Sequence, residues 1–195
     1  MEDRIGEIIE AGTTEFVAQS YELYKLPPLG SLVKTGDVSS TIYGIVYNAA
    51  TAGIEPGRRP VARGKDEPDE KAVYSSSPQL MKLLKSEFGA LIVGWQQDGQ
   101  THRYLPPHPA HLHGFVYRCG SDEVKEFSKS LSFLSILVNA HMSIPMEELV
   151  AAALRQMAAV QDDKHAFLVA AGKELATLLC GQYQQLRTVL GRLQS

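Results

Sequence analysis

The chain has 195 residues, of which 44% are hydrophobic and 21% are charged, and its net charge is −3. This is the composition of a globular protein. The weakly acidic balance argues against general nucleic-acid binding, which requires a strongly basic face. Two isolated cysteines, Cys119 and Cys180, are too few for a disulfide framework or a thiolate zinc site. We see neither a leader pattern nor an apolar run of about 18 residues, so we expect a cytoplasmic protein without a membrane partner.

Glycine and proline divide the chain near Gly120. All but one of the 10 prolines and all but three of the 16 glycines lie up to this point. Both residues punctuate short strands and turns, whereas their absence allows long helices. The sequence therefore predicts an α+β chain, with a small β-barrel domain over residues 1–118 followed by a helical domain over residues 121–195.

The first part contains short apolar stretches, rich in β-branched and aromatic residues, that are typical of strands. Turn signals join them at Gly12-Thr-Thr, at Thr35-Gly-Asp and at Gln97-Asp-Gly-Gln. The proline-rich and charged segment 53–77 indicates a long surface loop. Ser77-Pro78 then has Ser at an N-cap and Pro at N1, which predicts a helix over 79–88, so that an inserted loop and helix occupy about 53–88. The predicted strands are 5–10, 15–20, 32–34, 41–47, 91–96 and 102–105.

The second part is predicted to form a three-helix bundle. Apolar residues recur at alternating spacings of three and four from Val124 to Val138, and two further helices are expected over about 144–159 and from Asp162 or Asp163 to about Leu193. We interpret the apolar seam of the third helix as packing within the bundle, with a surface for a partner or for self-association as the alternative. The seam consists of Leu168, Leu175, Leu179, Leu186, Val189 and Leu193, with Gln182 as a polar interruption.

The N-terminal pattern resembles the HAS-barrel, the small six-stranded barrel found at the N-terminus of HerA-type helicases and of ATP synthase α and β subunits. The resemblance covers about the first fifty residues, with two later segments as plausible closing strands. It implies a barrel that packs beside its neighbours in a ring and does not itself hydrolyse ATP, and hence a role in assembly. The matching segments are Ile5-Gly-Glu-Ile-Ile, Thr14-Glu-Phe, Pro28-Leu-Gly-Ser-Leu-Val and Tyr43-Gly-Ile-Val, with Leu91-Ile-Val-Gly and Tyr104-Leu-Pro-Pro later.

The ATPase that accompanies such barrels has no counterpart in this sequence. A phosphate-binding loop requires Gly-x-x-x-x-Gly-Lys-Ser/Thr. The nearest approach is Gly172-Lys173, which has Phe167 in place of the first glycine and Glu174 in place of the hydroxyl residue. We therefore predict no ATP hydrolysis, no catalytic residues and no cofactor.

A histidine-rich segment is the one suggestive chemical cluster. His108, His111 and His113 lie within Leu105-Pro-Pro-His-Pro-Ala-His-Leu-His-Gly, with His102 nearby. Imidazoles at this density can bind Zn²⁺, and a metal-dependent enzyme is therefore one alternative. We favour a proline-rich connector between the barrel and the helices, because no cysteine or carboxylate follows at ligand spacing, and we predict no metal site.

A basic stretch precedes the predicted inserted helix. It runs from Arg58 to Lys65 and includes Arg59 and Arg63. Arginine can hold phosphate through paired hydrogen bonds, which leaves a nucleic-acid accessory factor as a further alternative. Acidic residues follow directly, however, so we interpret the stretch as a solvated charged loop and regard nucleic acid as an unlikely partner.

Taken with the missing ATPase, these features indicate a non-catalytic assembly or adaptor protein. Such a protein docks to itself, as a homo-oligomer, or to a protein partner in a larger complex. The sequence names neither the partner nor the pathway.

Overall fold

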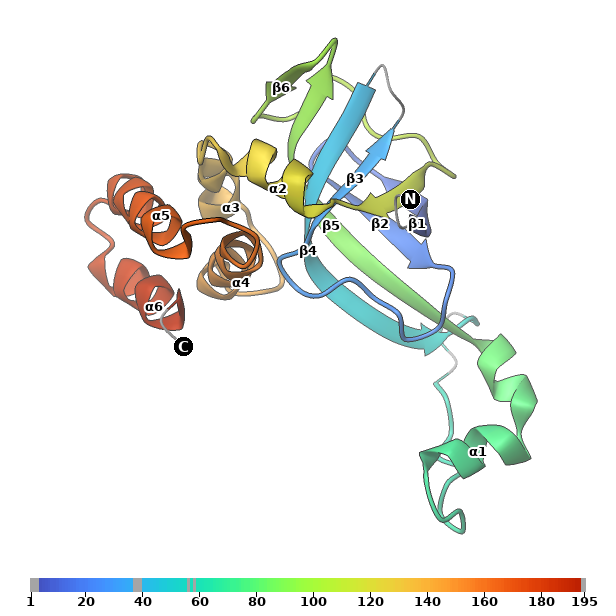
Figure 1. The fold of residues 1–195 in the computed structure, drawn as a ribbon. Helices are drawn as coiled ribbons and strands as arrows, with labels where there is room; N and C mark the ends of the chain where they lie inside the picture. The colour runs from blue at the N-terminus through green and yellow to red at the C-terminus, as the bar shows by residue number, and fades with distance from the viewer. Residues whose placement is uncertain (1–3, 37–39, 56, 58, 194–195) are drawn as a thin grey trace.

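The N-terminal part is a closed, six-stranded antiparallel barrel (Figure 1). The computed structural model describes residues 4–36, 40–55, 57 and 59–193. The strand order is β2-β1-β7-β3-β4-β5, and pairing of β2 with β5 closes the ring. The short strand β6 pairs with the C-terminal end of β5, on the side opposite β4. The strands are β1 (Arg4–Ala11), β2 (Glu15–Ser20), β3 (Leu32–Gly36), β4 (Ser40–Gly53), β5 (Leu84–Gln97), β6 (Gln100–His102) and β7 (Phe115–Arg118).

Two of the predicted turns are confirmed by the backbone geometry. Gln97 pairs with Gln100 across Asp98 and Gly99, whose φ angles of 51° and 78° are those of a type I′ hairpin turn. Between β1 and β2, the Gly12 N–H donates to the Glu15 carbonyl at 2.8 Å. At the third predicted turn Gly36 pairs with Thr41, and Asp37 lies outside the described residues.

The predicted helix over 79–88 is wrong in its second half. Residues Pro78–Leu83 form one short 3-10 helix (η1), and β5 begins at Leu84. Phe88 and Ala90 lie in the barrel interior, where β5 pairs with β2 on one side and β4 on the other. A helix does start at Pro78, as predicted, but it ends at Leu83. Beyond it, hydrogen bonding of β5 to both β2 and β4, and burial of the Phe88 ring, stabilise a strand more than a longer helix.

Strand β7 was not among the predicted strands, although it links β1 to β3. The predicted strand over 102–105 is shorter than expected, since β6 ends at His102. With β7 in place, the interior of the barrel is filled by side chains from every closing strand. They are Ile8, Phe16, Ala18, Val33, Ile42, Val46, Phe88, Ala90, Ile92 and Val116, with Ala110 from the preceding loop.

The C-terminal part is all helical among the described residues, but it contains five helices rather than three. The first predicted helix is broken between Ser128 and Leu134, and the third is broken at Leu179–Gln182, where Gly181 has a φ of 82°. A residue in that left-handed conformation ends a helix because no intrahelical ladder continues through it. The helices are α2 (Ser121–Ser128), α3 (Leu134–Asn139), α4 (Met146–Ala158), α5 (Lys164–Leu178) and α6 (Tyr183–Leu193).

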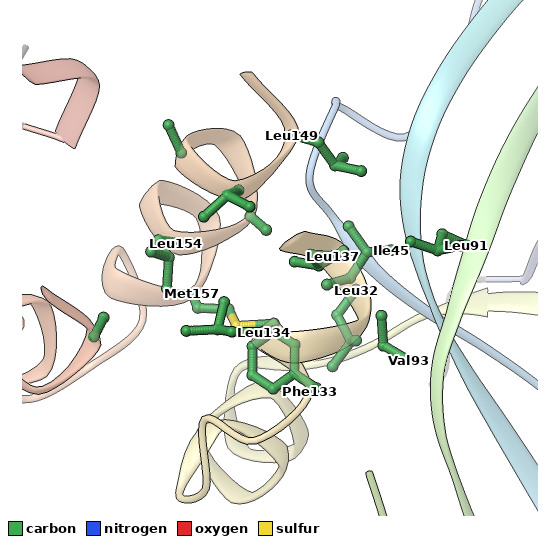
Figure 2. Packing of buried hydrophobic residues seen from close by; sticks show 14 of the residues in the cluster. Leu32, Ile45, Leu91, Val93, Phe133, Leu134, Leu137, Leu149, Leu154 and Met157 are labelled. Carbon is green, nitrogen blue, oxygen red and sulfur yellow. The ribbon is translucent and has the colours of Figure 1, made fainter. Parts of the chain in front are cut away.

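A second core joins the helices to the outside of the barrel (Figure 2). Because the middle parts of β4 and β5 are covered on both faces, residues 42–47 and 88–95 form nearly continuous apolar runs rather than alternating ones. Helix α4 lies between the barrel and helices α5 and α6 (Figure 1), and it is buried on nearly all sides from Leu149 to Leu154. The labelled contact residues are Leu32, Ile45, Leu91 and Val93 from the barrel, and Phe133, Leu134, Leu137, Leu149, Leu154 and Met157 from the helices.

In this interface, the backbone of the loop before β3 lies directly against the backbone of α4. A Cβ atom placed on Gly30, whose φ is +81°, would lie 2.4 Å from the Ala152 carbonyl carbon and 2.5 Å from the Ala153 nitrogen. Glycine is therefore required at this position of the loop before β3. This contact lets the helix lie directly against the barrel loop.

Polar contacts tie α2 to the same side of the barrel. The Arg103 guanidinium donates to the Phe127 carbonyl through Nε at 3.0 Å and through Nη2 at 2.8 Å. It also lies 5.4 Å from the centre of the Phe127 ring. Burial lowers the pKa of Arg103. In the first turn of α2, Glu123 accepts a hydrogen bond from Tyr43 at 3.1 Å and forms an ion pair with Lys34 at 3.0 Å.

A projecting arm completes the fold (Figure 1). Strands β4 and β5 pair in register to Gly53 and Leu84, and the connecting segment contains α1 (Glu70–Ser76) and η1. Asp69 caps α1 by accepting from the Ala72 N–H at 2.8 Å. Tyr74 of α1 shares a hydrogen bond with Tyr24 of the loop after β2, which fixes where the arm lies relative to the barrel.

Candidate functional site

The histidine-rich segment is spread along the rim of the barrel. His108, His111 and His113 are all exposed, and His102 lies apart from them against the Trp95 ring, with 4.4 Å between ring centres. Among the described residues, no group of three or more histidine, cysteine, aspartate or glutamate side chains is arranged to hold a metal ion. The segment connects β6 to β7 within the sheet, and not the barrel to the helices as the sequence predicted.

His113 has a specific structural role in this connector. Its φ of 64° lies in the left-handed region, its N–H donates to the Ile8 carbonyl at 2.9 Å, and its ring contacts Glu7 at 2.6 Å. Hydrogen bonds from His113 and from Tyr21 lower the pKa of the Glu7 carboxyl below its usual 4.5. Burial, and then the hydrogen bond to the Glu7 carboxylate, raise the pKa of Tyr21.

A cavity of about 540 Å³ lies between this connector and the end of the β5–β6 hairpin. His108 and His111 contribute to its wall, together with Trp95 and four residues of the proline-rich run. The Trp95 Nε1 is buried, and no partner for it lies among the described residues. Asp98 and the hydroxyl residues Thr35 and Ser40 also lie in this wall.

The basic stretch lies beside a different cavity, at the base of the arm. Arg58 is outside the described residues, but Arg59 and Arg63 both line a cavity of about 280 Å³. Lys82 of η1 joins them, and Glu55 is the acidic residue in the wall. The rest of the wall is mostly apolar and comes from both ends of the arm: Gly53, Ile54, Pro60, Val61, Leu80, Leu83 and Leu84.

The arm exposes several large apolar side chains. None of the described residues between 54 and 83 is buried. Ile54, Met81 and Leu83 are about half exposed, at 49%, 51% and 51%, and Val61 is 78% exposed. Scattered exposed apolar residues are normal, but a contiguous group around a cavity marks an interaction site.

The apolar seam of the third predicted helix is used internally. Leu175, Leu179 and Val189 are fully buried, and Leu186 and Leu193 pack against the same core. Leu168 is half-buried and lies outside this core cluster. The seam runs through the break at Gly181, so α5 and α6 fold back together against α4 rather than forming one long helix. Gly172-Lys173 lies within α5 and not in a strand-to-helix loop.

Three residues of the cavity wall, Leu80, Lys82 and Leu83, were not identified from the sequence. They lie within the predicted helix over 79–88, to which no contact was assigned. Nothing in the sequence contradicts that helix, because Leu80, Leu83 and Leu84 have helical spacing. Only the β4–β5 pairing brings them opposite Ile54 and Arg59.

No protein-family profile matches the chain, and a search of curated proteins finds no relative. The closed six-stranded antiparallel barrel is compatible with the fold that the resemblance to HAS-barrels implies. Within the described residues, none of the helices is both long and apolar enough to cross a membrane.

Proposed function

We propose that this chain is a non-catalytic interaction protein built on a HAS-type barrel, which docks to a protein partner or to itself in the cytoplasm. The observation that carries the proposal is the arm between β4 and β5. None of its described residues belongs to either core, yet it presents apolar side chains together with Arg59, Arg63 and Lys82 around one cavity.

The remainder of the molecule supports the same interpretation. The outward faces of β3, β4 and β5 are occupied by the chain's own helices, so this flank of the barrel cannot serve as a docking surface. Any partner must therefore use the arm, the rim or the other flank. The rim also has a cavity with exposed Phe115 in its wall, but the arm cavity alone of these two combines apolar residues with three cations, Arg59, Arg63 and Lys82.

The structure suggests a clean way to remove the arm. The Ile54 N–H donates to the Leu83 carbonyl at 2.9 Å, so Asn-Gly in place of residues 55–82 should close the β4–β5 hairpin with a type I′ turn. We expect this variant to keep its circular dichroism spectrum and its cooperative unfolding. It should lose the oligomeric state, or the co-purifying protein, that the wild type shows in light scattering and affinity purification.

A variant that folds and keeps both the wild-type mass in solution and the same co-purifying proteins would refute the proposal. Affinity purification from native extract should be carried out with the wild type and the armless protein in parallel. Proteins that bind non-specifically then appear in both samples and can be subtracted.

A further inference from the structure

The cavity at the base of the arm combines two features that are rarely left exposed together. Its wall holds the side chains of Arg59, Arg63 and Lys82, and no described acidic residue forms an ion pair with any of these three. With Glu55 as the acidic residue of the wall, positive charge is in excess. A complementary ligand therefore carries negative charge.

Charge alone does not describe the ligand, because most of the wall is apolar. Ile54, Val61, Leu80 and Leu83 line the cavity between the cations, and Val61 is 78% exposed to water. A small inorganic anion would leave this surface wet and would gain nothing from it. Burying an aliphatic or aromatic group there contributes about 25 cal/mol per Å² of apolar surface removed from water.

The size of the cavity decides between a small molecule and a side chain. Its volume of about 280 Å³ is just below the roughly 300–1,000 Å³ of sites that bury a drug-sized ligand. It therefore suits one or two apolar side chains of a chain that continues outside. The flanking cations are then free to contact carboxylates on either side of the anchor.

We propose that this cavity binds an acidic segment of a partner protein through an aliphatic or aromatic anchor flanked by aspartate or glutamate. The inference rests on the proposed interaction function and adds the chemistry of the partner. Arginine suits this role because its planar guanidinium forms paired hydrogen bonds with a carboxylate. The apolar wall supplies affinity, and the cations supply selectivity and a fast, salt-dependent association.

Fluorescence anisotropy with a labelled peptide of about ten residues, in which leucines are separated by glutamate and aspartate, tests this proposal. Two matched peptides separate the two contributions: one has lysine in place of every acidic residue, and the other has serine in place of every leucine. We expect only the peptide with both leucines and acidic residues to bind, and its binding to weaken as salt is raised from about 50 to about 500 mM.

Protein variants locate the site. Arg59→Glu and Arg63→Glu should each weaken binding of the acidic peptide at least about tenfold, without changing the unfolding temperature, because both residues are exposed. Lys173→Glu makes the same change of charge on an exposed residue of α5, at the far side of the molecule (Figure 1), and should leave binding unchanged.

Several results would overturn the inference. They are absence of binding by the acidic peptide, equal binding by the lysine peptide, and an equal loss of binding with Lys173→Glu. Light scattering in which wild type is dimeric and Arg63→Glu is monomeric would make a second copy of this chain the occupant. Each result leaves the armless variant as a separate test, because loss of partners there supports the interaction function whatever the peptides do.

Discussion

Replacing Gly30 by alanine should destabilise the protein strongly, because it separates two backbones that are in contact. The residue has a φ of +81°, and its new Cβ would lie 2.4 Å from the Ala152 carbonyl carbon and 2.5 Å from the Ala153 nitrogen. Both neighbours are backbone atoms of the buried helix α4, so no side chain can rotate away. Either the loop or the helix must move.

The magnitude follows from two costs. A non-glycine residue in the left-handed region costs roughly 1–2 kcal/mol, and overpacking a close contact adds about 1–3 kcal/mol. The expected loss is therefore about 2–5 kcal/mol from a total of about 5–15 kcal/mol. At about 2–4 °C per kcal/mol for a chain of this size, the unfolding temperature should fall by roughly 4–20 °C.

Gly181→Ala is the matched control. This residue has nearly the same φ, +82°, but a Cβ placed on it meets nothing within 4 Å. It should therefore cost only the conformational part, roughly 1–2 kcal/mol. Urea unfolding followed by circular dichroism measures both variants. If the two lose the same free energy of unfolding, the direct contact between the barrel loop and α4 does not exist as described.

Three further predictions concern separate features. Arg103→Leu should lower the free energy of unfolding by about 1–3 kcal/mol, since it leaves the Phe127 carbonyl without its donors; denaturant unfolding no different from wild type would contradict this. The contribution of Glu7 should be present above about pH 4.5 and should disappear as pH falls through its lowered folded pKa. Thermal unfolding should therefore show wild type losing stability relative to Glu7→Gln in that acid range, and parallel pH profiles would contradict the contact with His113. Finally, a thiol reagent should label exposed Cys180 at once and buried Cys119 only on unfolding, and two equally fast thiols would contradict the packing of β7 against α2.

The strands and turns that depend on local chemistry were predictable from the sequence. Asp98-Gly99 adopts the two positive φ angles of a tight hairpin, and Asp163 caps α5 by accepting from the Ala166 N–H at 2.9 Å, as expected. These features need only a few neighbouring residues, so their signals survive in a short window. The change from β to helical structure near Gly120 is legible for the same reason, because glycine and proline act locally.

The candidate site was only half predictable. The arginines of the basic stretch stand out in the sequence, and so do the histidines of the connector, yet nothing local indicates which group lines a cavity with apolar neighbours. Lys82 and Leu83 reach Arg59 only because β5 starts at Leu84 and pairs with β4 to the level of Gly53. The sequence favoured a helix there, so the partners remained unassigned.

The sequence by itself determined the short strands and helices, the caps and turns between them, and the weakly acidic composition of the chain. Only the tertiary structure decided that residues 84–88 form a strand, that β7 links β1 to β3, and that the helices share a core with the barrel. The reason is physical. Hydrogen-bond ladders and burial between distant segments exceed the small conformational preferences that a short stretch of sequence expresses, and they depend on neighbours that only the closed barrel brings together.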